Sequence, residues 1–152
     1  MNGYLVDTNI LSKFGKSEQP DPRVRLWVET AAPRTLFASV VTWGELRKGI
    51  EGQPSEQRRA GLEQWLEHDL REWFQSRLLP VTKTIADRWG VLAGQFKLKG
   101  RILTMADGLI AATALGLDLT LDSKRARFHR PWCDHSQSVD SLNLAAVPKT
   151  GN

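Results

Sequence analysis

The sequence predicts an α/β fold in which helices cover both faces of a central, mainly parallel sheet. Short apolar segments alternate along the chain with longer segments of helical periodicity, and this alternation is typical of parallel sheets. One helical segment, residues 106–115, is apolar almost all round, so it should be buried inside the protein. The 152 residues are 41% hydrophobic and 25% charged, as in an ordinary globular domain, and this composition excludes a disordered chain.

Three short apolar segments are expected to be strands: residues 4–6, 35–39 and 119–121. The first strand ends at Asp7, which therefore places a carboxylate at the carboxyl end of a buried strand. The helical segments are recognised by apolar residues at three- and four-residue spacing. They are 8–14, capped by the polar residues 7–9; a helix opened by Pro20 and Pro22; and 41–52, 55–77, 85–97 and 106–115.

The formal net charge of +4 is weak evidence for nucleic-acid binding, because most of it comes from the end of the chain. Residues 1–122 carry 16 basic and 15 acidic residues, a net of +1, whereas residues 123–152 carry 5 and 2, a net of +3. The apolar runs are too short to cross a bilayer, and the N-terminus lacks the pattern of a secretory signal. A single cysteine, Cys133, excludes an internal disulfide and fits a reducing cytoplasm, where we expect the protein to act.

Three acidic residues lie next to apolar segments, where an unpaired charge is costly to bury. Asp7 ends the first strand, Glu45 lies on the helix after the second strand, and Asp107 begins the most apolar helix. Each has an ordinary explanation when it is taken alone, because Asp7 and Asp107 can cap helices and Glu45 can be solvated or ion-paired. Taken together they suggest a site, because the carboxyl ends of parallel strands and the helices that follow them converge on one crevice.

Three carboxylates in one crevice repel one another unless a cation neutralises them. Oxygen ligands without histidine or cysteine favour Mg²⁺ or Mn²⁺. Such an ion suits phosphodiester hydrolysis, since it activates a water and stabilises charge on the phosphate. A phosphatase that forms an aspartyl-phosphate at Asp7 is disfavoured, because Asn9 stands where such enzymes have a second acid.

The segments around these acids read LVDTNILS over residues 5–12, SVVTWGELRKGI over 39–50 and ADGLIAATAL over 106–115. In sequence, order and separation they resemble PIN-domain ribonucleases, and specifically the VapC toxins of bacterial type II toxin–antitoxin systems. The resemblance covers residues 1–121. It implies a three-layer α/β/α sandwich, Mg²⁺-dependent cleavage of RNA (with Mn²⁺ as a substitute), a homodimer, and inhibition by a VapB-type antitoxin.

The family pattern also assigns roles to individual residues. It implies that Asp7, Glu45 and Asp107 are the catalytic residues that hold the metal, and that Thr8 supports the metal site. An alternative function is a catalytically impaired PIN-like module that binds antitoxin or RNA without cleaving it. RNA cleavage that depends on Asp7 would distinguish the two.

The chain departs from the family after Leu121. Such toxins continue with a segment like VTRNxxDF, which supplies a fourth acid, whereas residues 122–132 read DSKRARFHRPW. Codons permitted for residues 122–139 can be read one base later to spell the family ending, so we hypothesise a frameshift near Leu121. We therefore expect a PIN domain over residues 1–128 and a poorly ordered tail over 129–152. Asp122 fits a fourth metal ligand and an ordinary turn residue equally well.

Other residues allow sharper interpretations that the sequence does not favour. Arg47, Lys48 and Arg101 are candidate RNA-phosphate contacts, although a solvated surface explains them as well. His68 is expected to be solvated, and the histidines near Cys133 fit no standard zinc spacing. Five tryptophans lie on helical stripes and are expected to pack in the core or an interface rather than stack on bases: Trp27, Trp43, Trp65, Trp73 and Trp89.

Overall fold

The computed structural model describes residues 3–16 and 35–121. The backbone divides into two compact units, 1–122 and 123–152, and the described residues all belong to the first. The helix expected at Pro20, the tail expected over 129–152 and the boundary expected at residue 128 lie outside the described residues.

Four short parallel strands form the sheet, in the order β3-β2-β1-β4. They are β1 (Tyr4–Leu5), β2 (Leu36–Ser39), β3 (Leu78–Leu79) and β4 (Thr120–Leu121). Tyr4 lies opposite Leu36 on one side and Thr120 on the other, and Ala38 lies opposite Leu78. The parallel sheet is therefore confirmed, and β3, which consists of two residues before Pro80, is a strand that the sequence patterns did not reveal.

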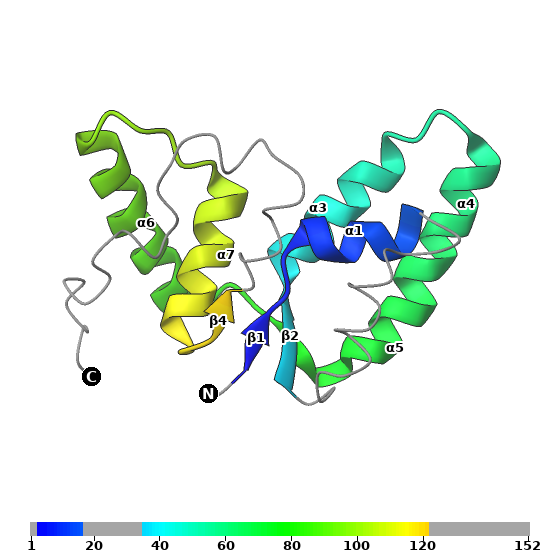
Figure 1. Ribbon diagram of the computed structural model, residues 1–152, viewed down its shortest axis with the longest axis horizontal. Helices are drawn as coiled ribbons and strands as arrows, with labels where there is room; N and C mark the ends of the chain where they lie inside the picture. The colour runs from blue at the N-terminus through cyan, green and yellow to red at the C-terminus, as the bar shows by residue number, and fades with distance from the viewer. Residues whose placement is uncertain (1–2, 17–34, 122–152) are drawn as a thin grey trace. The chain divides into compact units, whose positions relative to one another are not determined.

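Alternate residues of the strands face opposite sides of the sheet and belong to different cores, as the pleat requires. Val6, Leu36 and Ala38 join the cluster formed with α1 (Thr8–Lys16), α3 (Val40–Glu51) and the long helix that follows. Leu5 and Phe37 join the cluster formed with α7 (Met105–Gly116). Figure 1 shows these two groups of helices on either side of β1 and β2, so the three-layer α/β/α arrangement is confirmed.

The long helix on the first face changes its winding in the middle. It begins as α4 (Glu56–Gln64), continues as a π-helical segment, Trp65–Leu70, and ends as α5 (Arg71–Phe74) with a 3-10 turn, Gln75–Arg77. Its buried residues follow four-residue steps: Leu62, Leu66, Leu70 and Phe74. An α-helix of 3.6 residues per turn would rotate such a stripe by about 40° at each step. The wider π turns reduce this rotation and keep all four side chains in one core.

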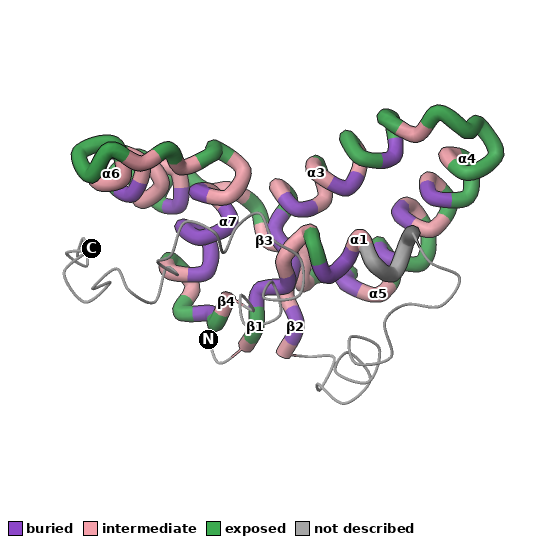
Figure 2. The backbone as a smooth tube through the Cα atoms, turned by 45° about the horizontal axis from the view of Figure 1, so that its top comes forward, coloured by how far each residue is buried: buried purple, intermediate pink, exposed green. Residues whose placement is uncertain are grey.

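On the second face, α6 (Lys83–Leu98) packs against α7. The buried part of α7 runs from Gly108 through Ile110 to Ala114, which confirms that this apolar helix lies inside the protein. Figure 2 shows that α6 is exposed along much of its length. No helix in the described part of the chain is long and apolar enough to span a membrane.

Candidate active site

Asp7 stands where β1 passes into α1, and it caps that helix. Its backbone carbonyl accepts hydrogen bonds from the N–H groups of Ile10, at 3.1 Å, and Leu11, at 3.3 Å. Its carboxylate accepts hydrogen bonds from the backbone N–H groups of Thr8 and Asn9 and, at 3.3 Å, from the Asn9 side-chain amide. The capping explanation is therefore correct for Asp7.

Capping does not fully compensate the Asp7 charge. Burial raises the pKa of this carboxyl above 3.8, and the hydrogen bonds from Asn9 and Thr8 only partly oppose that effect. The negative charge of Asp107 raises the pKa further, so the two carboxylates lie close enough to repel each other. A cation between Asp7 and Asp107 would compensate both the cost of burying the Asp7 charge and the repulsion by Asp107.

Asp107 lies in the first turn of α7 and is tied to the residue that caps this helix. The Thr104 hydroxyl accepts a hydrogen bond from the Asp107 N–H at 3.2 Å and donates one to its carboxylate. Thr104 was missed as a site residue, although a threonine three positions before an acid is a known signal of a helix start. The bond orients the Asp107 carboxylate at the beginning of the helix.

The first turn of α7 approaches α6 closely at Gly108. An added Cβ there would lie 2.5 Å from Cδ1 and 2.8 Å from Nε1 of Trp89, distances at which something must shift. Only glycine fits this contact, so the Trp89 indole fixes the position of the turn that carries Asp107. Nothing in the sequence pattern marked this contact, because it joins two helices through side-chain shape.

Glu45 reaches the site from α3, one turn into the helix. It lines a pocket of about 170 Å³ together with Thr8, and the Lys48 Nζ lies 3.9 Å from its Oε1. The Thr8 hydroxyl is buried and has no hydrogen-bond partner among the residues that the structure describes, and the same holds for Thr42 on α3. A buried hydroxyl without a partner is unusual, and at Thr8 it suits a residue that supports a bound ion or water.

The three predicted acids are brought together only in part. Asp7 and Asp107 interact, whereas Glu45 shares its pocket with Thr8. Among the described residues no group of three acidic, histidine or cysteine side chains is arranged to hold a metal ion. The prediction that all three carboxylates hold one ion stays a prediction, and Asp122 lies outside the described residues.

The candidate RNA contacts have different surroundings. Arg47 forms an ion pair with Glu67 of the π-helical segment, which gives this arginine a structural role between two helices. Lys48 is exposed and Arg101 is half-buried in the loop before α7. Their contact with RNA stays a prediction.

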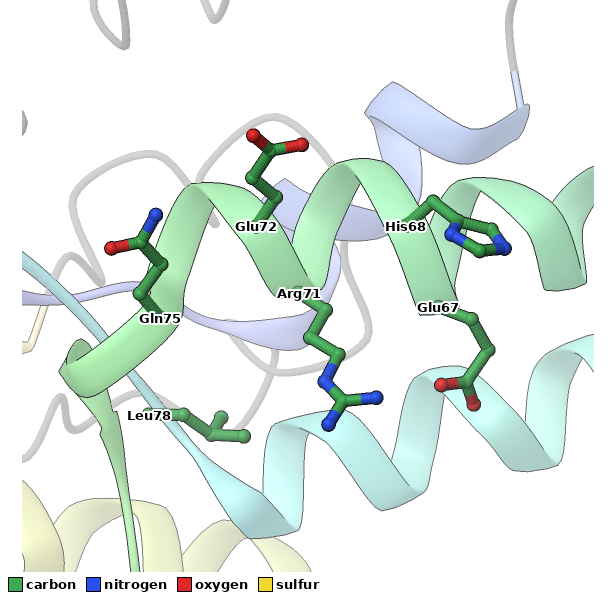
Figure 3. A pocket seen from close by; sticks show the side chains of 6 residues that line it. All are labelled: Glu67, His68, Arg71, Glu72, Gln75 and Leu78. Carbon is green, nitrogen blue, oxygen red and sulfur yellow. The ribbon is translucent and has the colours of Figure 1, made fainter.

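A larger hollow of about 460 Å³ lies beside the long helix, and none of the three acids is among the described residues that line it (Figure 3). Arg71 and Glu67 point towards α3, whereas Glu72 and Gln75 point away from it (Figure 3). The lining mixes basic and acidic side chains, and His68 is exposed, as expected. Trp43, Trp73 and Trp89 pack against the cores, which confirms the packing role expected of them, and Trp27 lies outside the described residues. Trp65 packs against a core as well, but it also lines the smaller pocket.

A model of the PIN domain matches residues 4–130, so the chain belongs to the PIN domain family. Among curated relatives, it is 34% identical over 111 residues to VapC ribonuclease Y4jK of Sinorhizobium fredii, covering 73% of this chain and 79% of that protein. It is 30% identical over 120 residues to Toxin FitB of Neisseria gonorrhoeae, covering 79% of this chain and 86% of that protein.

Solved structures have the same fold, and one of them is also 30% identical in sequence. The crystal structure of FitAcB from Neisseria gonorrhoeae superposes with a TM-score of 0.70 at 30% identity, covering 78% of this chain and 84% of that one. A toxin–antitoxin complex from Klebsiella pneumoniae has a TM-score of 0.57 at 23% identity, covering 82% of this chain and 90% of that one, and shares the fold.

Proposed function

We propose that this protein is a Mg²⁺-dependent endoribonuclease that acts as the toxin of a type II toxin–antitoxin system. The observation that carries the proposal is the Asp7 carboxyl, which lies where β1 passes into α1 and whose pKa is raised by burial and by the negative charge of Asp107. The name of the VapC ribonuclease relative and the toxin–antitoxin complexes among the related structures support it.

The donor set suits magnesium. Mg²⁺ in proteins is usually held by one or two carboxylates and keeps several waters, so a pair of acids is enough to bind it. We assign Asp7 and Asp107 as the ligands, with Glu45 acting from α3 and Thr8 as the supporting hydroxyl. When bound, the ion supplies an activated water and stabilises charge on the phosphate.

The protein's own residues prepare this site. Asn9 and the backbone of α1 hold the Asp7 carboxylate, and Thr104 holds that of Asp107, so neither carboxylate needs to reorient on binding. Glu45 lines the same pocket as Thr8 and Asn9, and Asn9 donates to the Asp7 carboxylate. Asp7 and Asp107 would hold the ion, and Glu45 would orient a water and accept its proton.

We also propose two protein partners, a VapB-type antitoxin and a second copy of this chain, both in the cytoplasm. The antitoxin is proposed as a partner because the related solved structures include toxin–antitoxin complexes. The second copy is supported by apolar side chains that lie exposed between the middle of α6 and the start of α7. They are Val91, Leu98, Ile102 and Met105.

The proposal is tested by cleavage of a mixed-sequence single-stranded RNA by the purified protein, with Mg²⁺ and with a chelator. We expect cleavage that needs the ion and falls to background in Asp7→Asn. Asp118→Asn is the matched control: it makes the same chemical change at the far end of α7, and asparagine tolerates the positive φ of 53° there. RNA binding without cleavage by the wild type would instead favour the impaired module.

A further inference from the structure

The pocket beside Glu45 lies between α1, α3 and the long helix. It adjoins the proposed active site through Asn9, which lines the pocket and donates a hydrogen bond to the Asp7 carboxylate at 3.3 Å. Trp65, at the start of the π-helical segment, also lines it. Its volume of about 170 Å³ is well below the 300–1,000 Å³ typical of sites for drug-sized ligands. It can hold one flat ring or one side chain.

The lining of the pocket is mostly uncharged. Asn9 and Gln53 contribute side-chain amides, and Trp65 is half-buried, so part of its indole remains accessible. Within the described residues, Gln53 forms a hydrogen bond through its backbone N–H, which donates to Ile50 at 3.0 Å. Among the described residues that line the pocket, Glu45 alone is charged.

We infer that this pocket binds the base of an unpaired RNA nucleotide next to the phosphate that is cleaved. The inference rests on the proposed ribonuclease activity. Single-stranded RNA is recognised by stacking of exposed bases on aromatic side chains and by hydrogen bonds to base edges. Trp65 provides an aromatic surface and the amides of Asn9 and Gln53 provide donors and acceptors. A base in the pocket would hold its nucleotide beside Glu45 and the acid pair.

Gly49 provides a way to fill the pocket without disturbing the fold. It lines the pocket on α3, and a Cβ added there would meet no atom of the described part of the chain within 4 Å. Gly49→Leu therefore places a side chain in open space and also replaces a poor helix former by a good one. Gly61→Leu on α4 is the matched control, because it makes the same change at a helical glycine whose added Cβ also meets none of the described residues but which does not line the pocket.

The experiment compares an RNA with versions that lack one base on either side of the cleaved phosphate. We expect that wild type loses roughly 5- to 100-fold in kcat/KM when one of these two bases is missing, the size of one base–aromatic stack. Gly49→Leu should show the same loss on intact RNA and no further loss on the RNA lacking that base. Gly61→Leu should behave as wild type on all of them.

Two results would overturn the inference. One is that the wild-type rate is unchanged both when the base on one side is removed and when the base on the other side is removed, or that Gly49→Leu cleaves intact RNA at the wild-type rate. The other is that Gly49→Leu cleaves normally but escapes inhibition by the antitoxin, which would assign the pocket to a side chain of that partner.

A binding measurement separates this inference from the proposed function. A short single-stranded RNA containing 2-aminopurine is titrated with the Asp7→Asn protein, alone and combined with Gly49→Leu. If Asp7→Asn quenches the fluorescent base and the added Gly49→Leu removes this quenching, the base site is supported even if the wild type cleaves no RNA. Equal quenching by both proteins rejects the base site whether or not the nuclease proposal holds.

Discussion

The Asp7 carboxylate accepts hydrogen bonds that a side-chain amide could also accept, but its charge is opposed by burial and by Asp107. The cost of this charge is present in the folded protein and absent from the unfolded chain. An aspartate kept in this position therefore destabilises the protein when no cation is bound.

Asp7→Asn should stabilise the protein at neutral pH in the absence of divalent ions. The folded-state pKa of Asp7 is raised, so the folded protein binds the proton more tightly than the unfolded chain does. Wild-type stability therefore falls as the pH rises from the unfolded value of 3.8 through the folded pKa, and the advantage of the variant grows over the same range.

The measurement is the free energy of urea unfolding for both proteins at about pH 3 and about pH 7. The difference should be small at the lower pH and clear at the higher one. Asp118→Asn should show no such pH-dependent gain. A pH-independent difference between Asp7→Asn and wild type would contradict the electrostatic explanation.

Gly108→Ala should destabilise the protein, because the new methyl group would collide with the Trp89 indole. Overpacking of this kind typically costs about 1–3 kcal/mol. Gly94→Ala on α6 is the control, because its Cβ would meet nothing within 4 Å in the segments 3–16 and 35–121; it should stabilise the protein by about 0.5–1 kcal/mol. Thermal and urea unfolding of both variants would test this, and equal stabilities would show that Trp89 moves aside freely.

At the scale of elements, Arg77 joins the end of the long helix to the sheet. Its guanidinium donates to the Leu36 carbonyl on β2 at 3.0 Å and to the Trp73 carbonyl, and it lies over the rings of Trp73 and Phe74. Burial lowers the pKa of this guanidinium, so the contacts are made at a partly dry position.

Arg77→Met should therefore lower the free energy of unfolding by about 1–3 kcal/mol, the cost of leaving buried carbonyl groups without a donor. Arg71→Met, at an exposed residue of the same helix, should change stability little. Urea unfolding of the two variants is the measurement. Similar losses of unfolding free energy in both variants would mean that the positive charge of the helix, and not the hydrogen bonds of Arg77, stabilises the protein.

The elements that the sequence predicted best are those with long periodic patterns. Residues 85–97 and 106–115 correspond to α6 and α7 within a few residues at each end, and the strand before Asp7 is β1. Strand β3 was missed because two leucines that follow a long amphipathic helix look like its continuation. The π-helical segment was missed because its residues also fit an ordinary helical stripe.

For the molecule as a whole, the exposed apolar side chains near the start of α7 predict a dimer. Leu98 is 89% exposed and Ile102 is 95% exposed, and apolar side chains that are exposed together are typical of an interaction surface. Ile102→Asp should therefore produce a monomer, because a charge buried in an apolar interface is costly. Light scattering measures the mass, with Thr84→Asp at the other end of α6 as the control; a monomeric wild type would contradict the proposal.

The candidate site was predictable to the extent that chain order determines it. Asp7 and Asp107 could be placed near each other because, in a parallel α/β fold, the end of the first strand and the start of this apolar helix are expected at the same crevice. The relation of Glu45 to them depends on the tilt of α3, and the roles of Thr104, Asn9 and Trp89 depend on side-chain contacts between separate segments. Sequence patterns contain neither the tilt nor those contacts.

The π-helical segment has a consequence for comparing this chain with its relatives. Such a segment contains one more residue than an α-helix needs for the same number of turns. A relative whose helix is wound regularly would lack that residue, so the correct alignment of the two chains has a one-residue gap inside a helix. An alignment that forbids gaps there would displace either Leu62 or Phe74 by one position, and would pair core residues of one protein with surface residues of the other.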